Sequence, residues 1–240
     1  MDIATLSKCA WNSYDCENCL CEEYMFFSGL GALLRPETIL EIGTELGLGA
    51  ASLFSGARQP VLMGNVLSLQ VPRLTTIDLE FDMPEIERTL TVCNVPKENV
   101  EFIKGDSREV LPQMVRANRW FDLVLMDGSH EEPFVSSDWK YVSQLSHFFI
   151  LHDSTQKPAV GRLVQNLHSV PEFEVLEFNA YRFGTVFGKV GGERIAKRGM
   201  PGITLVRRRQ SYGVKRTPEA LGRAEVAYLN EVNYPRSRVS

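Results

Sequence analysis

The sequence lacks several features that would mark other classes of protein. It has no run of about 18 or more apolar residues, so we expect no transmembrane helix. Its formal net charge is only −4, so overall charge favours neither nucleic acid nor an anionic membrane as a partner. The N-terminal segment has no basic region followed by an apolar core, so we predict a cytoplasmic protein without a secretory signal.

The dinucleotide-binding pattern G-x-G-x-x-G is also missing, although glycines do follow a strand. Thr38–Ile42 is a short apolar run that predicts a buried strand, and small residues after Gly49 predict a helix. Between them Gly43, Gly47 and Gly49 have the spacing G-x-x-x-G-x-G, which argues against an NAD-dependent dehydrogenase. Glycines in such a turn allow a ligand to approach closely, and the helix N-terminus offers N–H groups to an anionic or carboxylate-bearing ligand.

Strands and helices are expected to alternate along most of the chain, which predicts a doubly wound α/β sheet in one large domain. No structure is assigned to residues 59–72 or 179–201. Strands are expected at 38–42, 74–78, 100–104, 120–127, 147–153, 173–178 and 203–207, and helices from 49, at 83–93, from 107, at 134–145 and at 157–169.

Acidic residues end several of these strands. Asp78 follows the second strand, where an acid in nucleotide-binding folds accepts hydrogen bonds from ribose hydroxyls. The alternative for Asp78 is a helix N-cap, and Glu80 and Asp82 are lesser candidates for the ribose. Asp106 and Ser107 follow the third strand, and both are good N-cap residues for the next helix.

Asp127 and Asp153 end strands that we expect to be neighbours. Two carboxylates that close are unfavourable unless a cation or a proton lies between them, and oxygen ligands suit Mg²⁺. His130 follows Asp127 after a glycine turn and is the candidate general base, with a capping or core histidine as the alternative. His152 is expected to point to the opposite face if its strand continues, with a lesser chance of a metal or substrate role.

These motifs together resemble those of a known family. Glu41-x-Gly43-x-x-x-Gly47-x-Gly49, the D-G-x-H at Asp127–His130, Asp138 in the following helix and H-D at the end of the fifth strand resemble the class I S-adenosylmethionine (SAM)-dependent methyltransferases. The closest similarity is to the small-molecule O-methyltransferase branch that includes the macrolide sugar and catechol-type enzymes. It runs from about residue 36 to residue 179.

The resemblance implies a seven-stranded, mostly parallel Rossmann-like sheet and a SAM site. In that site the loop from Glu41 to Gly49 wraps the methionine end of SAM, and Asp106 with Ser107 lies beside the adenine. The cofactor-binding residues implied are Glu41, Gly43, Gly47, Gly49, Ser52, Asp78, Asp106, Ser107 and Asp127.

The same resemblance implies that Asp127 and Asp153 bind Mg²⁺, which holds the substrate's hydroxyls close to the sulfonium of SAM. Catechol-type enzymes have an Asn directly after the second acid, whereas this chain has Ser154, a weaker third ligand. Glu45 in the glycine loop is another candidate for that third position.

The predicted function is transfer of a methyl group from SAM to a hydroxyl of a small molecule, assisted by Mg²⁺. Asp127 and His130 are the predicted catalytic residues. Two alternatives remain open: a metal-independent methyltransferase that uses His130 as base, and a non-catalytic binding protein that retains the SAM fold.

The regions outside the resemblance divide the chain further. Residues 1–36 are expected to form a helical cap or lid, in which Cys9, Cys16, Cys19 and Cys21 are either buried thiols, zinc ligands or redox groups. Residues 37–210 form the SAM-binding domain, with a basic stretch from 189 that serves either as a solvated strand edge or for an acidic substrate. In the tail, 211–240, an expected helix at 217–230 would dock on the domain or on a second subunit, so a homo-oligomer is left open.

Overall fold

The computed structural model describes most of the chain, including every element of the expected domain. The cysteines Cys9, Cys16 and Cys19 and the expected helix at 217–230 lie outside the described residues. The described residues are 21–58, 61–63, 66–68, 70–178, 186–190, 193–197 and 202–209.

A seven-stranded sheet forms the centre of the fold, and it confirms the predicted α/β class. The strand order is β5-β4-β1-β6-β7-β11-β8, and β11 alone runs antiparallel to its neighbours β7 and β8. The strands are β1 (Thr38–Ile42), β4 (Arg73–Asp78), β5 (Val100–Lys104), β6 (Leu123–Met126), β7 (Phe148–His152), β8 (Phe173–Phe178) and β11 (Ile203–Arg208).

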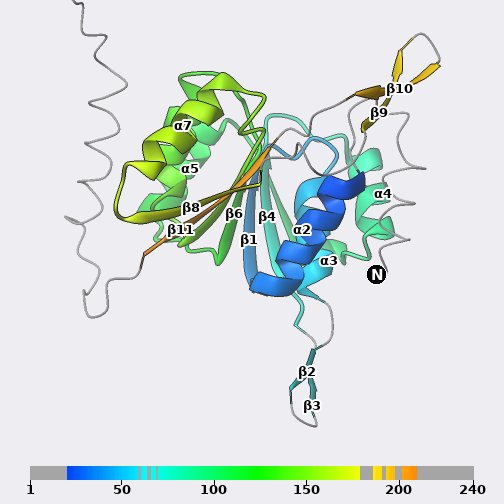
Figure 1. Ribbon diagram of the computed structural model, residues 1–240. Coiled ribbons are helices and arrows are strands. Elements are labelled where there is room, and N and C mark those ends of the chain that lie inside the picture. Colours follow the sequence, from blue (N-terminus) through cyan, green and yellow to red (C-terminus); the bar gives the residue numbers. More distant parts are fainter. Residues whose placement is uncertain are drawn as a thin grey trace, which may run out of the picture.

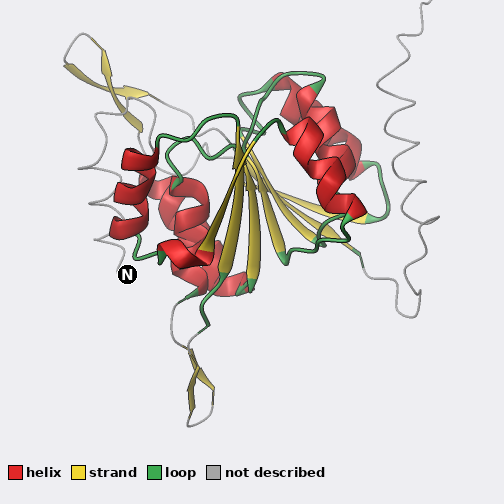
Figure 2. Cartoon of the chain, turned by 180° about the vertical axis from the view of Figure 1, so that it is seen from behind, coloured by secondary structure: helices red, strands yellow, loops and turns green. Residues whose placement is uncertain are grey.

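Helices cover both faces of this sheet and give the domain three layers (Figures 1 and 2). The helices α2, α3 and α4 lie on one face, and α5, α6 and α7 lie on the other. None of the helices in the described ranges is both long and apolar enough to cross a membrane. The helices are α2 (Cys21–Leu34), α3 (Leu48–Ala57), α4 (Met83–Val92), α5 (Ser107–Arg116), α6 (Phe134–Val142) and α7 (Pro158–His168), with a short 3₁₀ turn at Lys97–Asn99.

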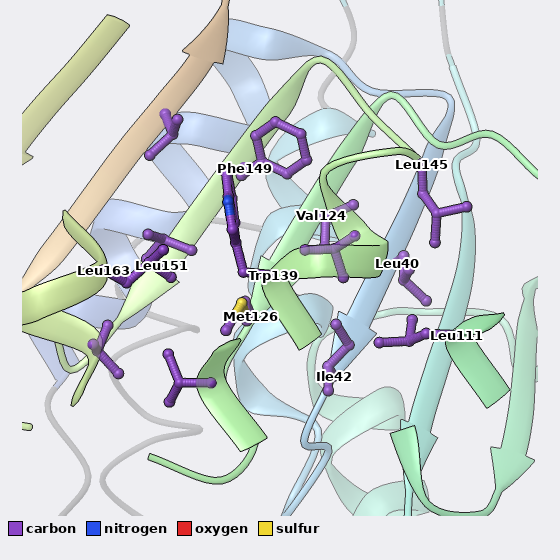
Figure 3. Close-up of a cluster of buried hydrophobic side chains, with 14 of the residues drawn as sticks. Leu40, Ile42, Leu111, Val124, Met126, Trp139, Leu145, Phe149, Leu151 and Leu163 are labelled. Atoms are coloured by element: carbon purple, nitrogen blue, oxygen red, sulfur yellow. The ribbon is translucent and has the colours of Figure 1, made fainter. Parts of the chain in front are cut away.

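Alternation along the central strands builds two separate cores. Leu40 and Ile42 of β1 point into the core under α5, α6 and α7, where Trp139 and Phe149 pack edge to face (Figure 3). Ile39, which directly precedes Leu40 in the strand, belongs to the core under α2, α3 and α4. Strands buried on both faces are expected in a parallel sheet, and this accounts for their continuous apolar runs.

The order of the strands fixes where a ligand can bind. The chain builds outward from β1 to β4 and β5, then returns to β6 on the other side of β1. The direction of strand order therefore reverses between β1 and β6, and the loops that follow these two strands turn to opposite sides of the sheet. In open α/β sheets ligands bind in the crevice at such a point. The predicted glycine loop and Asp127 lie at these two strand ends.

Two short antiparallel pairs were not predicted from the sequence. β2 (Val61–Met63) pairs with β3 (Val66–Ser68), and this ribbon projects away from the sheet (Figure 1). β9 (Val186–Val190) pairs with β10 (Glu193–Lys197) in a second ribbon.

Three arginines of the basic stretch lie at the end of β11 and directly after it. Arg207 and Arg209 pair with Glu174 of the edge strand β8, and Arg208 pairs with Glu172. These pairs match the strand-edge role, one of the two roles expected for the basic stretch.

Glycines allow α2 and α3 to pack with their backbones nearly in contact. A Cβ on Gly31 of α2 would lie 2.1 Å from the carbonyl oxygen of Leu53, and one on Gly56 of α3 would lie 1.9 Å from that of Ser28. Real Cβ atoms do not approach carbonyl oxygens so closely, so both positions require glycine. This contact docks the described part of the N-terminal cap firmly on the helix that follows the glycine loop.

Replacing Gly31 with alanine should therefore destabilise the protein. We expect Gly31→Ala to lower the free energy of unfolding by about 1–3 kcal/mol, as overpacking typically does. The matched control is Gly29→Ala in the same helix, where a Cβ would meet nothing within 4 Å. Thermal unfolding of both variants tests this, and equal melting temperatures would show that the two helices are not in close contact.

Candidate active site

The glycine loop joins β1 to α3 and lies directly against the end of β6. Gly43 has φ +84°, and a Cβ on it would lie 2.3 Å from the carbonyl oxygen of Asp127. Gly47 has φ +74° and is the N-cap of α3, while a Cβ on Gly49 would lie 2.8 Å from the side chain of Leu125. The positive φ of Gly43 and Gly47, and the close approaches at Gly43 and Gly49, favour glycine. The loop is thus held directly beside Asp127, one of the two predicted catalytic residues.

Glu41 lies beneath this loop rather than in its open side. The side chain is buried, with Oε1 accepting a hydrogen bond from the Ala50 N–H (2.9 Å) and Oε2 accepting one from the Thr76 hydroxyl (2.7 Å). Burial raises the pKa of the Glu41 carboxyl to about 8, in spite of these two hydrogen bonds. Glu41 therefore links β1, β4 and the first turn of α3, and its role at the cofactor stays a prediction.

Asp78 fixes the opposite side of the loop. Its Oδ2 accepts hydrogen bonds from the backbone N–H groups of Thr44 (2.7 Å) and Glu45 (3.0 Å), and its Oδ1 accepts one from Leu79 (2.7 Å). A carboxylate has about four acceptor positions, so these three bonds leave room for about one more donor. The geometry is compatible with one hydrogen bond from a ribose hydroxyl.

Asp106 and Ser107 begin α5, as predicted. Asp106 caps the helix by accepting from the Arg108 N–H (2.9 Å), and the Arg108 guanidinium holds the pKa of Asp106 below its usual value. The Ser107 hydroxyl donates to Oδ1 of Asp138 (2.7 Å). Asp138 is almost fully buried, and this burial raises the pKa of its carboxyl to about 6.

The carboxyl ends of β6 and β7 bring two acids and two histidines together. Nδ1 of His152 lies 2.6 Å from Oδ1 of Asp127. Nε2 of His130 lies 3.2 Å from Oδ2 of Asp153 and 3.5 Å from Oδ1 of Asp127. The predicted pairing of Asp127, Asp153 and His130 in one place is therefore present, and His152 joins them.

The expected orientation of His152 was wrong, for an identifiable backbone reason. The expectation assumed that the strand continued through Asp153, which would place alternate side chains on opposite faces. Instead β7 ends at His152, and Asp153 has φ +60°, a left-handed conformation that is uncommon outside glycine. This change of direction brings His152 and Asp153 to the same cluster, and such conformations are frequent at functional sites.

Two predicted ligands lie in enclosed positions. The Ser154 hydroxyl is buried and accepts a hydrogen bond from the Thr204 hydroxyl (2.9 Å). Ser52 is fully buried in α3, and within the described residues its hydroxyl has no hydrogen-bond partner. Their roles at the metal and the cofactor stay predictions.

The histidines determine the charge state of Asp127. Burial alone would raise the pKa of its carboxyl, but the imidazoles of His152 and His130 hold that pKa below its usual value. Asp127, His130 and His152 each offer one donor atom within 4.8 Å of the others, which is close enough for one metal ion. Nε2 of His130 is buried and faces the carboxylates of both Asp127 and Asp153.

Sequence reasoning gave little weight to two further residues at this site. Partial burial, together with the nearby charges of Asp127 and Asp78, raises the pKa of the Glu45 carboxyl. Leu79, directly after Asp78, is an apolar side chain that is 63% exposed. The sequence shows an apolar residue directly after the candidate ribose ligand, but only the structure shows that it is exposed.

Comparison with known proteins shows what part of the chain resembles a known family. Residues 40–147 match a protein family described as a methyltransferase domain. Among curated protein sequences, none matches the chain significantly.

Several solved structures share the fold. An O-methyltransferase from Bacillus cereus in complex with SAH is 17% identical, with 87% of this chain and 92% of that chain aligned at a TM-score of 0.57. TomG from Streptomyces achromogenes, an O-methyltransferase involved in tomaymycin synthesis and solved with SAM, is 19% identical over 86% and 88% of the two chains, with a TM-score of 0.57. An SAH-bound methyltransferase from Podospora anserina is 14% identical over 86% and 88%, with a TM-score of 0.58.

These findings confirm the resemblance to the class I SAM-dependent methyltransferases. The match covers the glycine loop, Asp78, Asp106, Asp127 and His130, and it ends at the residue before β7. Residues 40–147 thus resemble a methyltransferase domain, and the chain has the fold that was predicted.

The raised pKa of Glu41 has a measurable consequence for stability. The folded state keeps this proton up to about pH 8, whereas an ordinary glutamic acid loses it near 4.5, so folding becomes less favourable as pH rises through that window. We expect Glu41→Gln to lose less stability than wild type between about pH 6 and about pH 8.5, because the ionisation is removed. The raised pKa of Asp138 also makes folding less favourable as pH rises, but only up to about pH 6.

Melting temperatures at the two pH values provide the measurement. Glu80→Gln is the control, because that acid is exposed and pairs with Lys104 at the surface. Identical pH dependence in wild type and Glu41→Gln would contradict the assignment.

Proposed function

We propose that this chain, whose residues 40–147 match a methyltransferase domain, binds SAM at the glycine loop and methylates a hydroxyl of a small molecule. The observation that carries the proposal is the cluster of Asp127, His130 and Asp153 beside the loop. The fold neighbours solved with SAM or SAH support the cofactor, and those named as O-methyltransferases support the hydroxyl acceptor.

The cofactor would lie across the carboxyl ends of β1 and β4. The loop and first turn of α3, from Glu41 through Gly43, Gly47 and Gly49 to Ser52, would enclose its methionine part. Asp78 would accept a ribose hydroxyl at its remaining acceptor position, and Leu79 would offer apolar surface to the purine. Asp106 and Ser107 at the start of α5 would contact the adenine.

Methyl transfer needs an acceptor oxygen in line with the bond between sulfur and the methyl carbon. The oxygen attacks that carbon, the carbon–sulfur bond breaks with its electron pair left on sulfur, and SAH leaves. The enzyme therefore has to position the acceptor and remove its proton. The imidazole of His130 would take this proton, and the carboxylates of Asp153 and Asp127 beside its Nε2 would stabilise the imidazolium that forms.

The residues present also fit a divalent cation. The predicted set was Asp127, Asp153 and Ser154 with Mg²⁺, and both carboxylates lie near Nε2 of His130. His152 adds an imidazole to the donors, and imidazole suits manganese, iron(II) or zinc better than Mg²⁺. A bound cation would lower the pKa of the acceptor hydroxyl.

The remaining expectations complete the proposal. The acceptor is a small molecule rather than nucleic acid, in keeping with the net charge of −4, and we propose a cytoplasmic location. Residues 1–36 would act as a cap and residues 37–210 as the catalytic domain. Residues 211–240 would form a tail whose helix docks on the domain or on a second subunit.

Substitution of the proposed base should separate chemistry from cofactor binding. We expect His130→Gln to lower kcat by about 10²–10⁴-fold, because general base catalysis typically contributes that much. Asp127→Asn should also lose most activity, and both variants should keep SAH affinity in calorimetry. The matched control is His168→Gln. His168 is exposed, pairs with Glu177 and lies outside the cluster of Asp127, His130, His152 and Asp153.

The acceptor for these assays comes from a screen of hydroxylated small molecules with methyl-labelled SAM. Absence of SAH binding by wild type would overturn the proposed cofactor. Loss of SAH binding in Asp127→Asn alone would make that residue a cofactor ligand instead.

Metal removal should distinguish the two versions of the mechanism. If a cation assists, exhaustive chelation abolishes activity while SAH binding is unchanged, and activity returns with Mn²⁺ more than with Mg²⁺ because of the imidazole donors. Full activity after chelation, with no metal in the protein by elemental analysis, would leave His130 as the base without a cation.

A further inference from the structure

Two buried threonine hydroxyls connect Glu41 to the glycine loop. Thr76 donates a hydrogen bond to Oε2 of Glu41 (2.7 Å), and its oxygen is also hydrogen-bonded to the hydroxyl of Thr44. All three side chains are almost completely buried. A hydroxyl both donates and accepts, so the chain of bonds persists in the protonated form of Glu41 with the donor order reversed.

Sheet register explains why these residues meet. Glu41 of β1 lies directly opposite Thr76 of β4 in the parallel ladder, so both side chains project to the same face. This is the face covered by α3, as shown by the Ala50 N–H that reaches Glu41. Thr44 enters from the loop above and completes the chain.

The loop groups tied to this chain are those proposed to hold the cofactor. Thr44 is fixed twice: its hydroxyl bonds to Thr76, and its backbone N–H donates to Asp78 (2.7 Å). Glu45 next to it has φ +45°, an unfavourable conformation that its N–H bond to Asp78 helps to hold. Removing the hydroxyl contacts would let this strained segment relax and move Asp78 away from its present orientation.

We infer that Thr76 and Thr44 are positioning residues for the cofactor site, which hold the loop and Asp78 in the geometry that SAM binding requires. The inference rests on the proposed function. Neither residue needs to touch the cofactor, because the effect passes through the loop backbone. A site held in its binding geometry before the ligand arrives binds more tightly, since less ordering is needed on binding.

The neighbouring residue Thr75 provides a matched control. It lies one position earlier in β4 and projects to the opposite face. Its side chain is buried, as that of Thr76 is. Its hydroxyl is also hydrogen-bonded, to Oε2 of Glu101 (2.9 Å) and to Arg119 (3.1 Å). Replacing it removes a comparable buried hydroxyl that has no connection to the loop.

The experiment measures SAH affinity by calorimetry, well below the melting temperatures of all variants. We expect Thr76→Val to weaken SAH binding about tenfold, which corresponds to about 1.4 kcal/mol. Thr76→Ser keeps the hydroxyl and should restore affinity to within about twofold of wild type. Thr75→Val should leave affinity within about twofold of wild type even where it lowers the melting temperature as much.

A second variant keeps the test decisive if Thr76→Val does not fold. Thr44→Val breaks the same chain at the loop end and should weaken SAH binding by a similar factor. Where both variants fold, the double variant should bind SAH as tightly as the single variant with the lower affinity. The two losses should not add, because the residues act as one unit.

The outcomes separate this inference from the proposed function. The positioning role would be overturned if Thr76→Val and Thr44→Val bind SAH as tightly as wild type, or if Thr75→Val loses as much affinity as they do. In either case, SAH binding by wild type would still support the proposed cofactor. Absence of SAH binding by wild type would overturn both.

Discussion

The structure depends on a close approach of two backbones at the carboxyl ends of β1 and β6. Gly43 stands so near the carbonyl group of Asp127 that no side chain fits between them. The Asp127 N–H donates to the carbonyl of Ile42, and the Gly43 N–H donates to that of Ile77, so three strands meet at this point. The loop that would hold the cofactor and the residues that would deprotonate the acceptor thus share one fixed frame, and the distance between them is set by the sheet.

Negative charge gathers around this point with few cations to balance it. Glu41, Glu45, Asp78, Asp127 and Asp153 all come from the ends of β1, β4, β6 and β7 or from the loop between them. The protein lowers the cost in two ways: burial keeps Glu41 largely protonated, and two imidazoles stabilise the charge of Asp127. The remaining negative potential favours a positively charged ligand, which is the charge of the sulfonium of SAM.

Sequence reasoning located the sheet and the acids at its edge because both follow from short-range patterns. Apolar runs identify buried strands, and parallel strands necessarily gather their carboxyl ends at one edge. It failed for His152, whose orientation depends on where β7 ends and on the left-handed backbone of Asp153. It also missed that Glu41 and Thr76 are linked, because their contact arises from strand register between residues 35 positions apart. Such features depend on tertiary geometry and have no local signature in the chain.

The glycine contact between α2 and α3 has a consequence for local unfolding. The helix α3 is enclosed by α2 on one side and the sheet on the other, and its first turn carries the Ala50 N–H that anchors Glu41. Once α2 detaches, α3 loses the cover of Phe27 and Leu30 and keeps its packing against the sheet. The amides of α2, and those on the side of α3 that α2 covers, are therefore expected to become open to exchange together, while the contacts of α3 with the sheet remain.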